Sequence, residues 1–210
     1  MGEAHQWWCQ PCFQDYQRGR RSVSRERSRT RIDAAREFVV EHLSRHPCVD
    51  CGRADAVVLE FDHIGAKRAN VSALVGIGAP LARIALELDL CEVVCVNCHR
   101  RRTTTRFGSR RQEGGFVASS NRPLRDRNAA HLIGILRASG CTDCGETDVI
   151  VLDFDHLDGK TASVSELARR ECSIARLDAE IAKCVVRCAN CHRRRTAEQF
   201  GYYRFKADAA

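Results

Sequence analysis

The sequence predicts an α+β chain of two tandem small domains, each preceded by a helix, behind a basic N-terminal arm. Two observations lead to this fold class. The chain matches itself without gaps over Cys48–Gly108 and Cys141–Gly201, with identical residues at 30 of 61 positions. Each matching segment also combines a short β-branched, apolar run with stretches of helical periodicity. Because such a duplication produces two units of one kind, we divide the 210 residues into two domains.

The expected elements follow the same order in both copies. Apolar residues at helical spacing indicate the helices, and β-branched apolar runs indicate the strands. In chain order we expect a helix ending before Pro47, a strand over Val57–Phe61, a helix over Arg83–Leu88, a helix starting within Asn97–Arg102, a helix ending before Gly140, a strand over Val149–Phe154, and helices over Ser165–Arg170 and Ile174–Lys183.

Composition favours an intracellular protein with a polyanionic partner. The formal net charge is +7, from 34 Lys and Arg against 27 Asp and Glu. This surplus predicts nucleic acid as the partner, although a GC-rich genome also favours Arg over Lys. No run approaches the ~20 apolar residues of a membrane helix, and no leader-like segment opens the chain, so we expect no membrane partner. We expect a cytoplasmic, bacterial or phage-encoded protein, where paired cysteines more often bind zinc than form disulfides.

Each copy carries two Cys-x-x-Cys pairs. One pair places two thiolates at adjacent corners of a tetrahedral zinc site, and two pairs fill all four corners. We therefore expect two structural zinc ions per chain. Their expected ligands are Cys48, Cys51, Cys95 and Cys98 in the first copy and Cys141, Cys144, Cys188 and Cys191 in the second. Redox-active pairs are the alternative, but no thioredoxin-like βαβ pattern surrounds them.

Four further cysteines have less certain roles. Cys91 and Cys184 correspond to each other, and Cys91 competes with Cys95 as a ligand, although small buried hydrophobes are the favoured interpretation. Cys9-x-x-Cys12 resembles half of a zinc ribbon whose other half is absent.

The segments outside the copies differ in composition. Arg18–Arg36 contains eight arginines and few apolar residues, which predicts either a solvated helix or a disordered arm that orders on a phosphate backbone. The segment 109–127 is polar and rich in Gly and Ser, as linkers are. We therefore expect a zinc-ribbon remnant and basic arm over 1–33, a first domain over 34–108, a linker over 109–127 and a second domain over 128–205.

An Asp-His pair at the end of the expected strand recurs in both copies, as Asp62-His63 and Asp155-His156. Another histidine, His99 or His192, directly follows the last zinc cysteine. Successive helical residues point about 100° apart, so this histidine can face away from the zinc. The aspartate and this histidine then offer one oxygen and one nitrogen to an open Mg²⁺ or Mn²⁺ site. The histidine of the Asp-His pair remains as a general base, although a lone Asp-His pair is more often structural.

Asp62-His63 with Cys95-x-x-Cys98-His99-Arg100 resembles the HNH endonuclease family, in its four-Cys zinc-knuckle subgroup. Asp155-His156 with Cys188-x-x-Cys191-His192-Arg193 resembles it equally. The resemblance covers both copies and implies two tandem zinc-stapled ββα-metal domains. It implies His63 and His156 as general bases, and Asp62, His99, Asp155 and His192 as ligands of the catalytic metal. The family's central Asn, which holds the active-site loop, is missing from Asp89-Leu90-Cys91 and Ala182-Lys183-Cys184.

These features together predict a divalent-metal-dependent endonuclease that hydrolyses DNA phosphodiester bonds, with RNA left open as a substrate. Phosphate contacts are expected from Arg100, Arg102, Arg193 and Arg195, with solvated charge as the alternative. One base and one metal cut one strand, so we expect two separate nicking sites in a monomer with an internal pseudo-dimer. The alternative function is a non-catalytic zinc-binding DNA-binding protein, such as a regulator or packaging factor, which would not need the Asp-His and His set.

Overall fold

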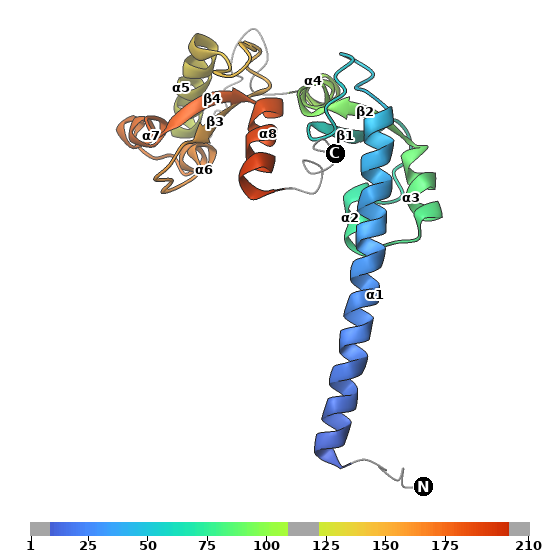
Figure 1. Ribbon diagram of the computed structural model, residues 1–210. Helices are drawn as coiled ribbons and strands as arrows, with labels where there is room; N and C mark the ends of the chain where they lie inside the picture. The colour runs from blue at the N-terminus through green and yellow to red at the C-terminus, as the bar shows by residue number, and fades with distance from the viewer. Residues whose placement is uncertain (1–8, 109–121, 202–210) are drawn as a thin grey trace. The chain divides into compact units, whose positions relative to one another are not determined.

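The structure is a computed structural model, and it describes residues 9–108 and 122–201 as a mixture of helices and two small sheets (Figure 1). Up to residue 108 its elements are α1 (Gln10–Arg45), β1 (Leu59–His63), α2 (Val71–Gly76), α3 (Leu81–Leu88), β2 (Cys91–Cys95) and α4 (Val96–Phe107). From residue 122 they are α5 (Pro123–Ser139), β3 (Leu152–His156), α6 (Val164–Arg169), α7 (Ile174–Ile181), β4 (Cys184–Cys188) and α8 (Ala189–Phe200). The strands pair as β1 with β2 and β3 with β4.

Contacts divide the chain into two compact units. The described residues of one unit are 9–45 and 63–92, which contain α1, α2 and α3. Those of the other are 46–62, 93–108 and 122–201. The expected domains over 34–108 and 128–205 follow the duplication instead, and they stay a prediction.

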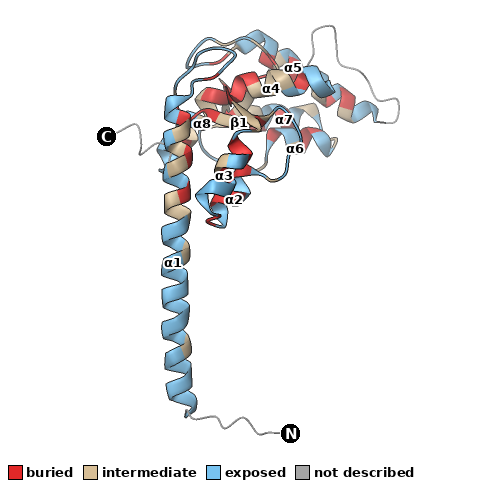
Figure 2. Ribbon diagram, turned by 90° about the vertical axis from the view of Figure 1, so that its right-hand side faces the viewer, coloured by how far each residue is buried: buried red, intermediate tan, exposed pale blue. Residues whose placement is uncertain are grey.

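Helix α1 packs only through its C-terminal part. Its buried residues are Ala35, Val39 and Leu43, spaced four apart so that they share one face. Figure 2 shows the preceding turns as exposed, so the structure gives Arg18–Arg36 as a solvated helix, one of the two expected alternatives. The loop between α2 and α3 approaches α1 closely at Gly78, where an added Cβ would lie 2.9 Å from the Cβ of Arg31. Only glycine fits there, since its φ of +59° also disfavours other residues.

Strands β3 and β4 pair across the connection that contains α6 and α7 (Figure 1). The strands are antiparallel, and their register pairs Leu152 with Cys188 and His156 with Cys184. The first apolar cluster joins these strands to α5 through Ile133, Leu136, Cys141, Val149, Val151, Leu152, Val186 and Cys188. A second cluster, Val164, Leu167, Ala168 and Leu177, joins α6 to α7. In chain order, α6 and α7 lie between β3 and β4, and α8 follows β4 directly.

Both predicted strands begin too early along the chain. The sequence predicts Val149–Phe154, but β3 spans Leu152–His156. The preceding residues form a turn, because the carboxylate of Asp148 accepts the N–H of Ile150 at 3.0 Å and its carbonyl accepts the N–H of Val151 at 3.0 Å. The first copy shows the same displacement, from the expected Val57–Phe61 to β1 at 59–63. The Asp-His pairs are therefore the last two residues of β1 and β3.

The expected helices are present, with ends that differ by a few residues. Pro123 begins α5 and Gly140 caps its end, so the helix starts within the expected linker 109–127. Ser173 caps α7 by accepting the N–H of Arg176. The sequence patterns missed α2, β2 and β4. No helix in the described ranges is both long and apolar enough to cross a membrane.

Candidate metal centres

The eight cysteines assigned to zinc lie in two groups of four, as the sequence predicts. Within each group all four Sγ atoms lie within 4.8 Å of one another. The Sγ atoms of Cys51 and Cys95 are 3.8 Å apart, and those of Cys144 and Cys188 are 3.7 Å apart. Zn–S bonds of about 2.3 Å at tetrahedral angles separate the sulfur atoms by roughly 3.8 Å. Both groups are therefore compatible with one structural zinc ion each.

In the second copy, β4 and the first turn of α8 carry one half of the four-Cys group. Cys188 ends β4 and is the N-cap residue of α8, and Cys191 follows in the first helical turn. Cys141 and Cys144 lie in a tight turn after α5. Burial opposes ionisation of Cys141, but backbone N–H groups, that of Cys188 foremost, outweigh it and lower the pKa of this thiol to about 7. Cys141 is therefore substantially ionised at neutral pH, the form that binds zinc.

The remaining cysteines lie outside both groups. The thiols of Cys91 and Cys184 donate to the carbonyl oxygens of Glu87 and Glu180, at 3.2 Å and 3.4 Å. Burial, followed by the nearby carboxylate of Glu180, raises the pKa of Cys184 to about 11, so this thiol stays protonated. The structure thus groups Cys95, and not Cys91, with the zinc cysteines.

The N-terminal cysteine pair lies at the start of α1. Cys9 and Cys12 are exposed there, and the Sγ of Cys9 accepts the N–H of Cys12 at 3.4 Å. Within the described residues the pair belongs to no metal-compatible group of three or more ligands.

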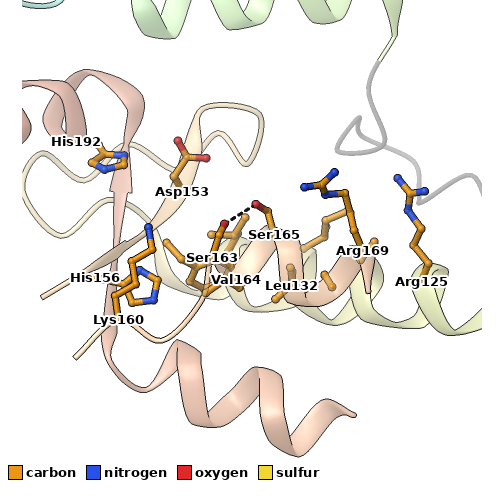
Figure 3. Close-up of a pocket in the computed structure, with 15 residues that line it drawn as sticks. Arg125, Leu132, Asp153, His156, Lys160, Ser163, Val164, Ser165, Arg169 and His192 are labelled. Carbon is orange, nitrogen blue, oxygen red and sulfur yellow. Dashed lines mark hydrogen bonds between the residues drawn. The ribbon is translucent and has the colours of Figure 1, made fainter. Parts of the chain in front are cut away.

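The second copy brings its Asp-His pair close to its following histidine. Asp155 and His156 are the last residues of β3, and His192 lies near the start of α8. The Oδ1 atom of Asp155 is 3.5 Å from Nε2 of His192. His156 and His192 both line a cavity of about 400 Å³. Figure 3 shows these histidines and Asp153 at the end of the cavity away from Arg125 and Arg169. Burial of Asp155 is outweighed by hydrogen bonds from arginines, which lower the pKa of its carboxyl.

The first copy repeats part of this arrangement. The Oδ1 atom of Asp62 is 3.5 Å from Nε2 of His99. The Nδ1 of His99 lies 2.5 Å from Oε1 of Glu60, and this hydrogen bond raises the pKa of His99. His63 belongs to the other compact unit, where its Nε2 lies 2.8 Å from Oε1 of Glu87.

Glu180 is a site residue that the sequence patterns missed. Its carboxylate is only 3% exposed and lies 2.9 Å from Nε2 of His156. It also accepts the backbone N–H groups of Thr161 and Ala162, at 2.9 Å and 3.2 Å. It therefore holds the loop after β3. Glu87 accepts three corresponding hydrogen bonds in the first copy.

The sequence does contain a signal for these glutamates. Glu87 and Glu180 are identical between the copies, and each lies 24 residues after the histidine it contacts. The charge of Lys183 and the hydroxyl of Thr161, with backbone donors, depress the pKa of Glu180 strongly. The identity between the copies and the lowered pKa both indicate that this buried carboxylate has a specific role.

The four arginines assigned to phosphates each pair with a carboxylate of the chain itself. The pairs are Arg100 with Asp153 at 2.7 Å, Arg102 with Asp50 at 2.6 Å, Arg193 with Glu60 at 2.7 Å and Arg195 with Asp155 at 2.7 Å. Their role in binding nucleic acid stays a prediction.

Comparison of the chain with protein-family models, with curated proteins and with solved structures finds no match in any of the three. What the protein does is therefore inferred from its motifs and from the geometry described above. That geometry establishes two four-Cys groups in a mixed α/β chain.

Proposed function

We propose that this protein is a divalent-metal-dependent endonuclease of the HNH type, which hydrolyses phosphodiester bonds of DNA. The observation that carries the proposal is the meeting of Asp155, His156 and His192 in the second copy. His156 and His192 line one cavity there, and Oδ1 of Asp155, which is not a lining residue, lies 3.5 Å from Nε2 of His192. The same copy carries a closed four-Cys group. A purely structural zinc domain needs only the cysteines.

The Asp155–His192 pair fits a hard divalent cation. Ligand atoms bound at about 2.1 Å on neighbouring corners of an octahedron lie roughly 3 Å apart. The observed 3.5 Å between Oδ1 and Nε2 is close to this separation and longer than a good hydrogen bond. Two protein ligands leave positions for water and a phosphate oxygen. A bound Mg²⁺ or Mn²⁺ would polarise the phosphate and stabilise the leaving oxygen.

His156 is held as a base. A carboxylate only accepts hydrogen bonds, so Glu180 fixes the neutral tautomer of His156 that carries its proton on Nε2. The lone pair is then on Nδ1, and no described residue hydrogen-bonds that atom. We assign to Nδ1 the removal of a proton from the attacking water. The assignment gives Glu180 the role of a positioning residue.

The cavity also offers cations for a phosphate backbone. Arg125, Lys160 and Arg169 line it together with the two histidines, and Figure 3 shows the two arginines away from His192. Arg169 pairs with Glu166, whereas Arg125 and Lys160 form no salt bridge with any described residue. We therefore expect Arg125 and Lys160 to contact phosphates on either side of the scissile bond.

The test is cleavage of supercoiled plasmid by the full chain with Mg²⁺ or Mn²⁺, and with EDTA. We expect nicked plasmid only with the metal, and a ~10²–10⁴-fold lower rate for His156→Ala, since that variant lacks the base. The matched control is His131→Ala, because His131 pairs with Asp178 on an exposed surface and does not line the cavity. Labelled RNA of the same sequence is tested in parallel.

Two outcomes would contradict the proposal. DNA binding with no metal-dependent cleavage would favour the non-catalytic zinc-binding regulator or packaging factor. Equal losses in His156→Ala and His131→Ala would show that His156 acts only through folding. Zinc content and DNA affinity, measured on each variant, separate these outcomes from misfolding.

A further inference from the structure

The two copies differ in what surrounds their corresponding aspartates, Asp62 and Asp155. In the first copy, Arg106 donates to both oxygens of Asp62, from Nη1 to Oδ1 at 2.8 Å and from Nη2 to Oδ2 at 2.9 Å. In the second copy, Arg187 and Arg195 both donate to Oδ2 of Asp155, at 2.8 Å and 2.7 Å. Among the described residues, the Oδ1 of Asp155 therefore has His192 as its one side-chain neighbour, whereas the Oδ1 of Asp62 already binds a guanidinium.

The difference originates at two positions of the duplication. Arg106 on α4 corresponds to Gln199 on α8, which is exposed and makes no ion pair. Arg187 on β4 corresponds to Val94 on β2. Both aspartates thus have arginine partners. For Asp155, however, Arg187 extends from β4 and donates to Oδ2, not to Oδ1, the oxygen near His192. Only Arg106 reaches the oxygen nearest the histidine.

From this geometry we propose that the second copy alone binds the catalytic cation, and that Arg106 excludes the cation from the first copy. The inference rests on the proposed function. A guanidinium keeps its charge at every physiological pH, so Arg106 keeps a positive group on Oδ1 of Asp62, the oxygen that stays open in Asp155. A divalent cation between Asp62 and His99 would have to share Oδ1 with that positive group or displace it.

The proposal replaces the expected pair of equal nicking sites with one cutting copy and one modified copy. The first copy keeps its four-Cys group and its His63–Glu87 contact. Its Asp62 oxygen nearest His99 is bound by Arg106, and this is the difference that the exchange tests. One substitution should therefore restore metal binding there, and the reverse substitution should remove it from the second copy.

The experiment exchanges the two residues in the full, zinc-loaded chain. Mn²⁺ binding is measured from the paramagnetic resonance signal of free Mn²⁺, and cleavage is measured on plasmid. We expect one tightly bound Mn²⁺ per chain in the unmodified protein, a second in Arg106→Gln, and none in Gln199→Arg. Cleavage by Gln199→Arg should fall by ~10²-fold or more, because the guanidinium takes the metal position. Gln199→Ala is the matched control and should bind one Mn²⁺, since it adds no charge.

Each outcome decides the proposal. Two equal Mn²⁺ sites in the unmodified protein, or unchanged Mn²⁺ binding in Gln199→Arg, would overturn the exclusion by Arg106 while leaving the endonuclease assignment intact. No Mn²⁺ binding and no cleavage in the unmodified protein would overturn the proposed function itself. If Arg106→Gln loses its zinc and does not fold, Gln199→Arg still decides, because position 199 is exposed.

Discussion

Asn97 and Asn190 exchange hydrogen bonds between the two copies. The backbone N–H of Asn97 donates to Oδ1 of Asn190 at 3.2 Å, and the N–H of Asn190 donates to Oδ1 of Asn97 at 3.0 Å. Both residues are 5% exposed and occupy the same position of the duplication. Such reciprocity is typical of a two-fold interface, here formed within one chain by the starts of α4 and α8.

Ion pairs repeat the same reciprocity around the two asparagines. Arg100 pairs with Asp153 and Arg193 with Glu60, each at 2.7 Å, and both arginines and both acids occupy equivalent positions. Arg101 pairs with Asp148 at 2.7 Å, and Arg194 pairs equivalently with Asp55. The copies are therefore joined by the first two arginines of each run, Arg100 and Arg101 in one copy and Arg193 and Arg194 in the other.

The first prediction concerns the asparagine pair. Asn97→Ala removes the acceptor of a buried N–H, and Asn190→Ala does the same, so each should lower the free energy of unfolding by about 1–3 kcal/mol. The measurement is urea unfolding of the zinc-loaded chain. Asn70→Ala is the control, because Asn70 is exposed and makes no side-chain capping bond to α2. Equal stability of all three variants would show that the interface contributes nothing.

The second prediction concerns Glu180. Glu180→Ala leaves Nε2 of His156 and two partly buried backbone N–H groups without an acceptor, which should destabilise the fold by roughly 1–3 kcal/mol. Glu180→Gln keeps most of the packing but loses the charge that fixes the tautomer. We expect Glu180→Gln to stay folded, to cut DNA more slowly, and to show a shifted pH–rate profile. A slower variant with an unchanged pH profile would assign Glu180 to folding alone.

The third prediction is loss of zinc on acidification. Zinc binds thiolates, so protons compete with it, and affinity should fall as pH falls. The pKa of Cys48 and Cys141 is lowered to about 7 by backbone N–H groups that outweigh burial. Without metal, these two thiols are mostly ionised above pH 7 and mostly protonated below it. As the pH falls through about 7, the metal-free sites therefore lose these thiolates as zinc ligands. The measurement is the release of zinc to a chromophoric chelator between pH 8 and pH 5. One EDTA-treated sample serves as the zinc-free control.

Retention of both zinc ions by a chelator-challenged chain at pH 5 would contradict this prediction. So would a far-ultraviolet circular dichroism spectrum that is unchanged after complete zinc removal. Structural zinc contributes on the order of 10–16 kcal/mol to small zinc domains, and the apolar clusters around these cysteines are small.

The fourth prediction concerns the exposed part of α1. Deletion of residues 1–30 removes arginines that make no buried contacts and keeps Arg31, which packs beside Gly78. If these arginines contact DNA phosphates, the deletion should weaken binding to all sequences and reduce the salt slope by about 0.9 for each lost contact. Fluorescence anisotropy at several salt concentrations measures the slope. An identical slope after deletion would reduce this helix to a spacer.

The sequence by itself determined the metal-binding framework. Cys-x-x-Cys pairs are local, and their duplication predicted the two groups of four that the sulfur distances confirm. The choice of Cys95 over Cys91 came from the structure. Helical periodicity likewise located the helices before Pro47 and Gly140. The strand boundaries were predicted wrongly, because apolar residues such as Val57 and Ile150 lie in turns that the aspartates before them stabilise.

Only the tertiary structure decided what each charged residue does. Glu180 and His156 are 24 residues apart, and no local spacing rule joins a residue near the end of α7 to the end of β3. The difference between Arg106 and Gln199 is visible in the sequence, but its meaning depends on where α4 brings the guanidinium, 44 residues beyond Asp62. The spacing of zinc ligands can be recognised in a sequence, because each pair of ligands lies in one short segment. Ion pairs between distant elements cannot be recognised in this way, because the packing of the whole chain determines which charges meet.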